Sequence, residues 1–151
     1  MVFDRWEFGS EFHFDSGAVA GSNTPPTPWS SHPNRLYSCG RDALTEALRQ
    51  GGVAFGWRRL WVPDYMCEEV VEAAQSVIEI ARYRCLPTEP FPRPWESLNL
   101  GDTDALLIVN TFGLREGTDW PTERVFGVIE DHTHDPTSAW ASTSSADFAL
   151  A

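Results

Sequence analysis

Two continuous apolar runs restrict the fold of this chain more than any other feature. Residues 105–110 read ALLIVN, and residues 125–129 read VFGVI. Neither run alternates apolar with polar side chains, so neither suits a strand that has one face in water. Such runs are typical of strands covered on both faces, as in a parallel sheet. The segment 146–151, ADFALA, resembles the start of another strand of this kind.

Helical patterns alternate with these apolar runs along the chain. The spacing of apolar residues predicts helices over 41–50 and 66–76, and strands over 59–62 and 77–83. The glycine pair Gly51-Gly52 is expected to end the first helix. Strands that alternate with helices predict an α/β fold, with an open, mostly parallel sheet and right-handed crossover connections.

The first 34 residues differ from the rest of the chain. Residues 17–33 are rich in Gly, Ser, Thr and Pro, a composition typical of loops. We therefore expect an N-terminal arm and loop over 1–34 and one folded unit over 35–151. The last residue, Ala151, lies inside an apolar segment, so we expect the chain to be the N-terminal fragment of a longer protein.

The charge balance argues against several classes of partner. The chain has 22 acidic and 11 basic residues and a formal net charge of −11, so it is expected to bind neither nucleic acid nor anionic membranes. It contains no apolar run of the roughly 18 residues that cross a bilayer, and no signal peptide. We expect a cytoplasmic protein with reduced cysteines. All 11 basic residues are arginines, so the chain has no lysine amine.

The densest group of ionisable residues directly follows the second apolar run. Residues 130–135 read EDHTHD. In open α/β sheets, ligands bind in the crevice at the carboxyl ends of the strands, which is where this segment is predicted to lie. Acids and histidines at such a place favour a binding or catalytic site. A solvated loop whose charges face water is the alternative.

A metal site is a second way to explain the same segment. His132, His134 and Asp135 form an H-x-H pair followed by a carboxylate, and zinc uses these ligand types. The two other histidines, His13 and His32, lie in the loop-rich N-terminal part. A metal-dependent hydrolase therefore remains a candidate.

Two further stretches are predicted to lie at the same edge of the sheet. Residues 38–44 (SCGRDAL) place a turn of small residues before a helix, where free N–H groups and the helix dipole favour a phosphate. A plain helix cap is the alternative there. Residues 63–67 (PDYMC) follow a predicted strand, but Tyr65 and Cys67 can equally be packed side chains.

Taken in order, these stretches resemble the first part of the fold-type-I pyridoxal-phosphate enzymes, most closely the DegT/DnrJ/EryC1/StrS aminotransferase family. The matching segments are GRDAL at 40–44, VPDYM at 62–66, the apolar strand and F-G turn at 105–113, EDHTH at 130–134 and ADFA at 146–149. The similarity covers residues 35–151, and its most specific element is E-D-x-x-H. It implies the three-layer large domain of these enzymes, in incomplete form.

The resemblance also implies pyridoxal 5'-phosphate as the cofactor. The residues that match its contacts are Gly40, Arg41 and Asp42 for the phosphate, Asp131 for the pyridine nitrogen and His134 for the ring 3-oxygen. Cys67 falls where relatives stack an aromatic side chain on the ring. The family's Schiff-base lysine would follow the D-F-A strand and is absent from these 151 residues.

The expected function is that of a fragment of a pyridoxal-phosphate-dependent aminotransferase, inactive as the isolated chain. The resemblance implies a keto-sugar or similar small carbonyl substrate, and a homodimer for the full-length form. A non-catalytic binding or regulatory protein with the same cofactor-domain architecture is a second hypothesis. The metal-dependent hydrolase that would use His132, His134 and Asp135 is a third.

Overall fold

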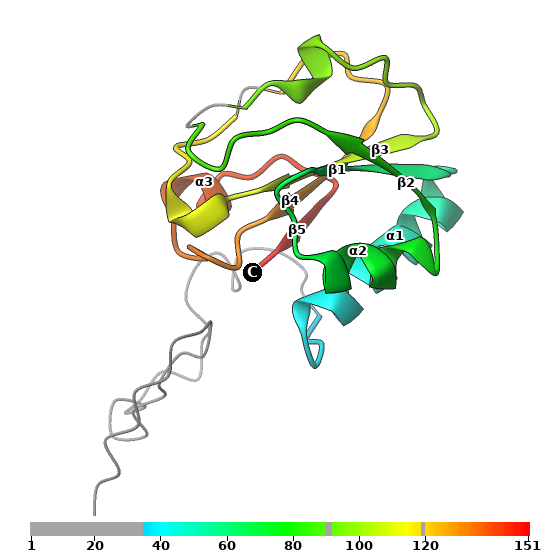
Figure 1. Ribbon diagram of the computed structural model, residues 1–151, viewed down its shortest axis with the longest axis horizontal. Helices are drawn as coiled ribbons and strands as arrows, with labels where there is room; N and C mark the ends of the chain where they lie inside the picture. The colour runs from blue at the N-terminus through cyan, green and yellow to red at the C-terminus, as the bar shows by residue number, and fades with distance from the viewer. Residues whose placement is uncertain (1–34, 90–91, 119) are drawn as a thin grey trace, which may run out of the picture.

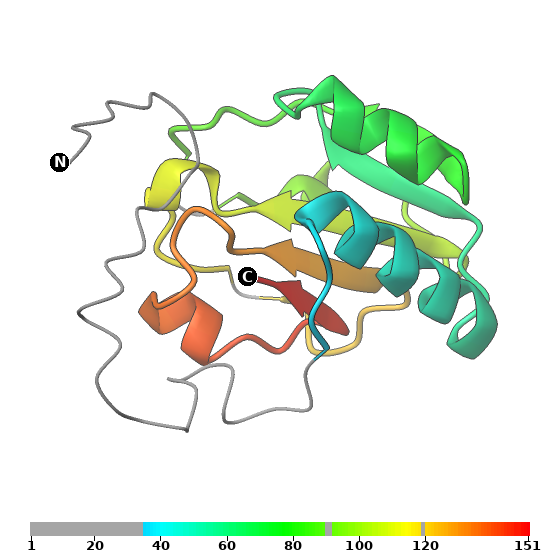
Figure 2. The same cartoon turned by 90° about the horizontal axis from the view of Figure 1, so that it is seen from below.

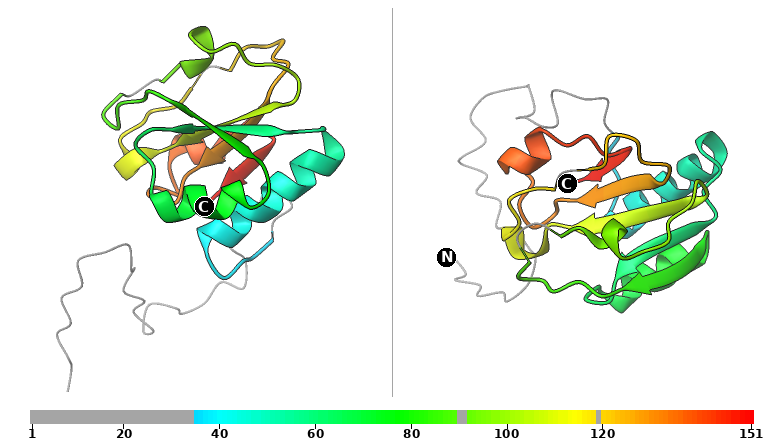
Figure 3. Two further views of the ribbon diagram at one scale, coloured as in Figure 1. Left: turned by 45° about the vertical axis from the view of Figure 1, so that its right-hand side comes forward. Right: turned by 90° about the horizontal axis from the view of Figure 1, so that it is seen from above.

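Five parallel strands form one sheet in the computed structural model, which describes residues 35–89, 92–118 and 120–151 (Figure 1). The strands are β1 (Arg59–Pro63), β2 (Glu79–Tyr83), β3 (Asp104–Val109), β4 (Gly127–Asp131) and β5 (Phe148–Leu150). Their order across the sheet is β2-β1-β3-β4-β5, which the right-hand view of Figure 3 displays. Every neighbouring pair is parallel, so the α/β fold with a parallel sheet is confirmed.

Helices cover one face of the sheet. The helices α1 (Gly40–Ala54) and α2 (Glu68–Gln75) lie side by side on this face, as Figure 2 shows. The short helix α3 (Ala139–Ser142) lies between β4 and β5 in the chain. Two 3-10 turns, η1 (Pro94–Glu96) and η2 (Thr111–Gly113), complete the elements.

The core under α1 and α2 is built around Trp57. Its indole fills a space between Gly51 of α1 and Gly127 of β4, and a Cβ atom at either glycine would lie 2.0–2.1 Å from the indole ring. Only glycine leaves room for the indole at these two positions. The other buried apolar residues of this face are Leu44, Leu48, Leu60, Val62, Val71, Ala74, Ala105, Leu107, Val109, Ile129 and Leu150.

The opposite face of the sheet carries an aromatic core. Tyr83, Cys85, Leu106, Ile108, Phe126, Val128 and Trp140 are buried there, with Trp61, Trp95 and Trp120 packed against them. The six residues of β3 are therefore buried on both faces, as the continuous apolar run predicts.

Several predicted boundaries are wrong by a few residues. The helix predicted for 41–50 continues through Gly51 to Ala54, because the close packing of Trp57 makes Gly51 a residue of the helix interior. The strand predicted for 125–129 instead occupies Gly127–Asp131, and Val125 is 64% exposed. Register explains this shift, since β3 pairs with β4 from Ala105↔Gly127 onward. The sequence patterns also gave no signal for α3.

The N-terminal arm and loop predicted for residues 1–34 lie outside the described residues, so they stay a prediction. No helix in the described part of the chain is both long enough and apolar enough to traverse a bilayer.

Candidate functional site

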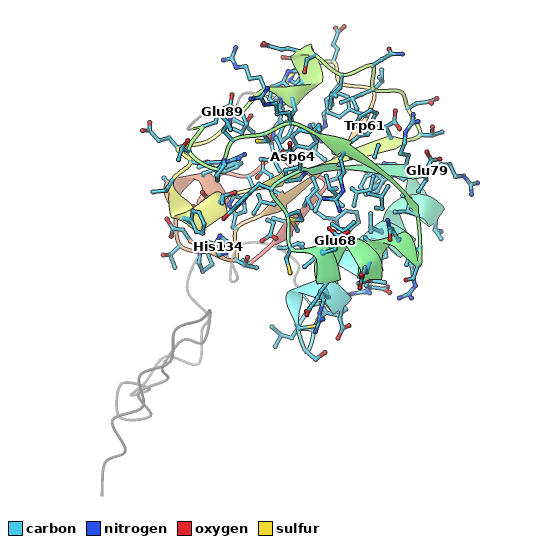
Figure 4. All side chains as sticks on the ribbon, in the orientation of Figure 1. Trp61, Asp64, Glu68, Glu79, Glu89 and His134 are labelled. Atoms are coloured by element: carbon cyan, nitrogen blue, oxygen red, sulfur yellow. The ribbon has the colours of Figure 1, made fainter. Side chains whose placement is uncertain are left out.

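The strand order creates a natural ligand position between β1 and β3. From β1 the chain adds β2 on one side, then crosses to β3 on the other side. In open α/β sheets, ligands bind where the strand order reverses in this way, outside the carboxyl ends of the strands. In Figure 4, His134 marks this edge, and Glu79, at the start of β2, lies at the opposite end.

Three exposed aromatic side chains meet at this edge. Tyr65 follows β1, Phe112 follows β3, and His134 follows β4. The rings of Tyr65 and Phe112 contact edge to face at 6.1 Å, and those of Phe112 and His134 stack at 5.7 Å with an interplanar angle of 14°. Tyr65 is 54% and Phe112 57% exposed. The cluster therefore offers aromatic surface to a ligand at the reversal of strand order.

The backbone of Phe112 is strained. Its φ is +57°, and Phe112 is the only non-glycine residue with a positive φ in the described ranges. An aromatic residue in this region is uncommon, and such strain often marks functional sites. The Phe112 N–H donates to Nδ1 of His134 over 2.9 Å. In the neutral imidazole the proton is therefore on Nε2, which is left as a donor.

Asp131 ends β4 on the same face as α1 and α2. Side chains alternate along a strand, so Asp131 shares a face with Ile129, which packs in the α1–α2 core. Its Oδ1 accepts hydrogen bonds from the Thr133 backbone N–H (3.0 Å) and hydroxyl (2.8 Å). Among the described residues, Oδ2 has no hydrogen-bond partner. The half-buried carboxylate thus has one fixed and one free oxygen.

The start of α1 keeps its backbone N–H groups free of a side-chain cap. Its N-cap residue is Cys39, and a Cβ at Gly40 would meet no atom within 4 Å. Arg41 donates to Glu69 of α2 over 3.0 Å. Asp42 accepts a hydrogen bond from Ser38, which, as the leading cause, holds the pKa of Asp42 below its ordinary value of 3.8. An anion at this turn would be attracted by the helix dipole and by Arg41, but it would be repelled by the Asp42 carboxylate.

The Arg41–Glu69 pair brings the starts of two helices together. Cys67 is the N-cap residue of α2, and its exposed thiol is free of disulfides. Gly40, Arg41, Asp42 and Cys67 therefore form one group, while Asp131 and His134 form a second on β4 and its loop. No hydrogen bond or ion pair between described residues links the two groups.

Glu130 and His132 belong to the other face of the sheet. Both side chains are buried, and His132 Nε2 lies 3.1 Å from Oε2 of Glu130. The Trp120 indole N–H donates to the other Glu130 oxygen over 2.6 Å. Burial opposes ionisation of Glu130, but hydrogen bonds from His132, Ser144 and Trp120 outweigh it and lower its pKa below 4.5. Nδ1 of His132 is buried and has no hydrogen-bond partner among the described residues.

The predicted EDHTHD site is therefore divided by the sheet. His132 is buried with Glu130, whereas His134 is exposed beside Phe112. The described residues contain no group of three His, Cys, Asp or Glu side chains placed to hold a metal ion. The structure thus does not assemble His132, His134 and Asp135 into the ligand set of a hydrolase, because β4 ends at Asp131 and the chain turns after the buried His132, which leaves His134 exposed beside Phe112.

Sequence reasoning gave no functional role to Phe112 or Trp120. The F-G turn was a signal for Phe112, but its contacts with Tyr65 and His134 depend on the strand order. Nothing in the sequence pairs Trp120 with Glu130. Comparison of the chain with protein-family models, curated proteins and solved structures finds no match.

Proposed function

We propose that the chain is the N-terminal part of the cofactor domain of a pyridoxal-phosphate-dependent aminotransferase, without turnover on its own. The observation that carries the proposal is the position and hydrogen bonding of Asp131. It is a half-buried carboxylate at the carboxyl end of a central parallel strand, on the helix-covered face, with one oxygen fixed by Thr133 and one free. A protonated pyridine nitrogen requires an acceptor of this kind.

The residues around Asp131 suit the rest of the cofactor. When bound, pyridoxal 5'-phosphate supplies an electron sink that is effective while its ring nitrogen is protonated. In this proposal Asp131 holds that proton, and the Nε2–H of His134 donates to the ring 3-oxygen. The uncapped N-terminus of α1 at Gly40, Arg41 and Asp42 binds the phosphate through backbone N–H groups.

The exposed aromatic pair adds to the proposal. Cys67, at the family's stacking position, has no ring, but Tyr65 and Phe112 present aromatic surface at the same edge of the sheet. We assign the apolar wall of the cofactor site to these two residues. Phe112 also orients His134, because its N–H occupies Nδ1.

Substrate and assembly follow from the resemblance alone. The proposal includes a keto-sugar or similar small carbonyl substrate and a homodimeric full-length form. The reactive lysine of the family is not among the 151 residues, so this chain binds the cofactor without covalent attachment in the site.

Cofactor binding to the purified chain tests the proposal. Pyridoxal 5'-phosphate, followed by its near-ultraviolet absorbance and by tryptophan quenching, should bind saturably and more tightly than pyridoxal, which lacks the phosphate. Asp131→Asn should weaken binding by about tenfold, the loss of a charge-assisted hydrogen bond. Asp102→Asn, the same change in an exposed residue just before β3, should leave binding unchanged. Equal affinities for Asp131→Asn and the unmodified chain would contradict the proposal.

The absence of lysine favours a second candidate function. A binding or regulatory protein that keeps the cofactor-domain architecture needs no reactive amine. It would share the affinity for pyridoxal 5'-phosphate and the dependence on Asp131. Transamination by the full-length protein, measured with a keto-sugar and an amino donor, distinguishes the two candidates.

A further inference from the structure

A pocket of about 280 Å³ opens on the face of the sheet opposite α1 and α2. Its wall is formed by the loop after Arg115, by β4 and by α3 with the residues that follow it. The side chains that matter here are Glu116, Thr118, Trp120, Glu130, Trp140 and Ser144. Asp131 and His134 are not among its lining residues, so it is separate from the proposed cofactor site.

The described part of the pocket wall carries negative charge only. Glu130 and Glu116 contribute two carboxylates, and no arginine or histidine lines the pocket. Arg124, on the adjacent chain segment, is engaged elsewhere, because it pairs with Asp147 over 3.1 Å and also donates to the Ser145 carbonyl. Glu130 is buried and its two oxygens already pair with Trp120 and His132, so it attracts a cation through space, whereas the exposed Glu116 can contact the cation directly.

Two tryptophans give the pocket rigid aromatic surface. The indole of Trp120 is held by its hydrogen bond to Glu130 and by a ring contact with Trp95 at 4.7 Å. Trp140 is buried and meets His132 edge to face, with centroids 4.7 Å apart. Indole faces attract cations through their quadrupole, and the attraction is strongest where water is excluded. Because both rings are already fixed, a ligand would not have to order them.

We propose that this pocket binds a small organic cation carrying an ammonium group. Glu130 and Glu116 neutralise its charge, Trp120 and Trp140 contact its apolar surface, and the hydroxyls of Thr118 and Ser144 accept hydrogen bonds from it. The volume limits the ligand to a small molecule. This site is independent of pyridoxal phosphate, so either proposal can fail without the other.

A matched pair of ligands tests the role of charge. Choline and 3,3-dimethyl-1-butanol have the same shape and differ in the charged nitrogen. Both would be titrated into the full 151-residue chain while the indole N–H resonance of Trp120, identified by its loss in Trp120→Phe, is followed by NMR. Choline should shift this resonance saturably and bind at least about tenfold more tightly than the neutral alcohol. Equal binding of the two, or no saturable shift with choline, would overturn the proposal.

Charge-removing variants test the two carboxylates. Glu130→Gln should weaken choline binding by about tenfold or more, and the exposed Glu116→Gln by a few fold. Glu123→Gln removes an exposed carboxylate that does not line the pocket and should leave choline binding unchanged. If Glu130→Gln does not fold, the proposal is still tested by the choline affinity of Glu116→Gln and by the comparison of choline with the neutral alcohol. Choline affinity that is unchanged in Glu116→Gln, or that falls equally in Glu123→Gln, would contradict the proposal.

Discussion

The imidazole Nε2 of His132 lies 3.1 Å from Oε2 of Glu130, and both side chains are buried on the aromatic face of the sheet. The second carboxylate oxygen accepts from Trp120, so the three side chains form one network. A buried carboxylate is tolerated only while its hydrogen bonds are made. Each member of this network therefore matters more for stability than an exposed residue of the same type.

Replacing His132 should destabilise the fold. His132→Ala removes a partner of the buried Glu130 carboxylate, at an expected cost of about 3–5 kcal/mol in the free energy of unfolding. His134→Ala removes the other histidine of the segment, which is exposed, and should cost about 1 kcal/mol. Urea denaturation gives both values. Similar midpoints for the two variants would contradict the network.

Glu130 should make stability depend on acid pH. Its folded pKa lies below the ordinary value of 4.5, so its contribution to stability is complete above that value. The contribution is lost as pH falls through the lower, folded pKa. The free energy of unfolding, measured by urea denaturation from pH 7 to pH 3, should fall less steeply below pH 4.5 in Glu130→Gln than in the unmodified chain. Glu123→Gln should keep the original slope, and an unchanged slope in Glu130→Gln would refute the assignment.

A side chain at Gly127 should destabilise the fold. A Cβ there would lie 2.1 Å from the Trp57 indole, so Gly127→Ala should cost about 1–3 kcal/mol through overpacking. At Gly40 a Cβ meets no atom within 4 Å, so Gly40→Ala should change the stability by less than about 0.5 kcal/mol. Thermal melts of the two variants compare them directly. A melting temperature for Gly127→Ala equal to that of Gly40→Ala would mean that Trp57 packs elsewhere.

Two variants of Phe112 should distinguish the effect of its strained backbone on stability from the effect of its ring on cofactor binding. With φ at +57°, glycine suits this position better than alanine, so Phe112→Gly should be more stable than Phe112→Ala by about 1 kcal/mol. Both variants remove the ring that contacts Tyr65 and His134, so both should bind pyridoxal 5'-phosphate more weakly. Melting temperatures and cofactor titrations measure the two effects. Unchanged cofactor affinity would remove Phe112 from the site.

The chain should form no covalent cofactor link in the proposed site. A Schiff base requires an unprotonated amine, the chain has no lysine, and arginine stays protonated. The N-terminal amine of Met1 is the remaining amine. Borohydride reduction in the presence of pyridoxal 5'-phosphate, followed by peptide mass mapping, should find an adduct at Met1 or none. An adduct at any other residue would refute this prediction.

Much of the fold was predictable because its signals are local. The run 105–110 contains too many adjacent apolar residues for a half-exposed strand, and it became the fully buried β3. The apolar spacing in 41–50 likewise identified α1. The end of α1 was not predictable, since Gly51 normally stops a helix. Here it is retained within the helix because Trp57, six residues later, occupies the space that a side chain would need.

The candidate site was predictable only in outline. The sequence placed acids and histidines after a buried run, but its predicted strand ended before Glu130. The structure extends β4 through Asp131, so the two adjacent acids lie on opposite faces of the sheet. Asp131 joins the edge where α1 and α2 begin, and Glu130 joins Trp120 and His132.

The sequence by itself determined the class of fold, the absence of a lysine amine and the segments that carry ionisable groups. Composition and apolar periodicity can be read from the chain without knowledge of its tertiary contacts. Tertiary structure decided which of those groups share a face. That choice depends on strand register and on the order β2-β1-β3-β4-β5, which bring Tyr65 to Phe112 and His134 from three separate strands. Register and order arise from packing between residues far apart in the chain, so no local pattern encodes them.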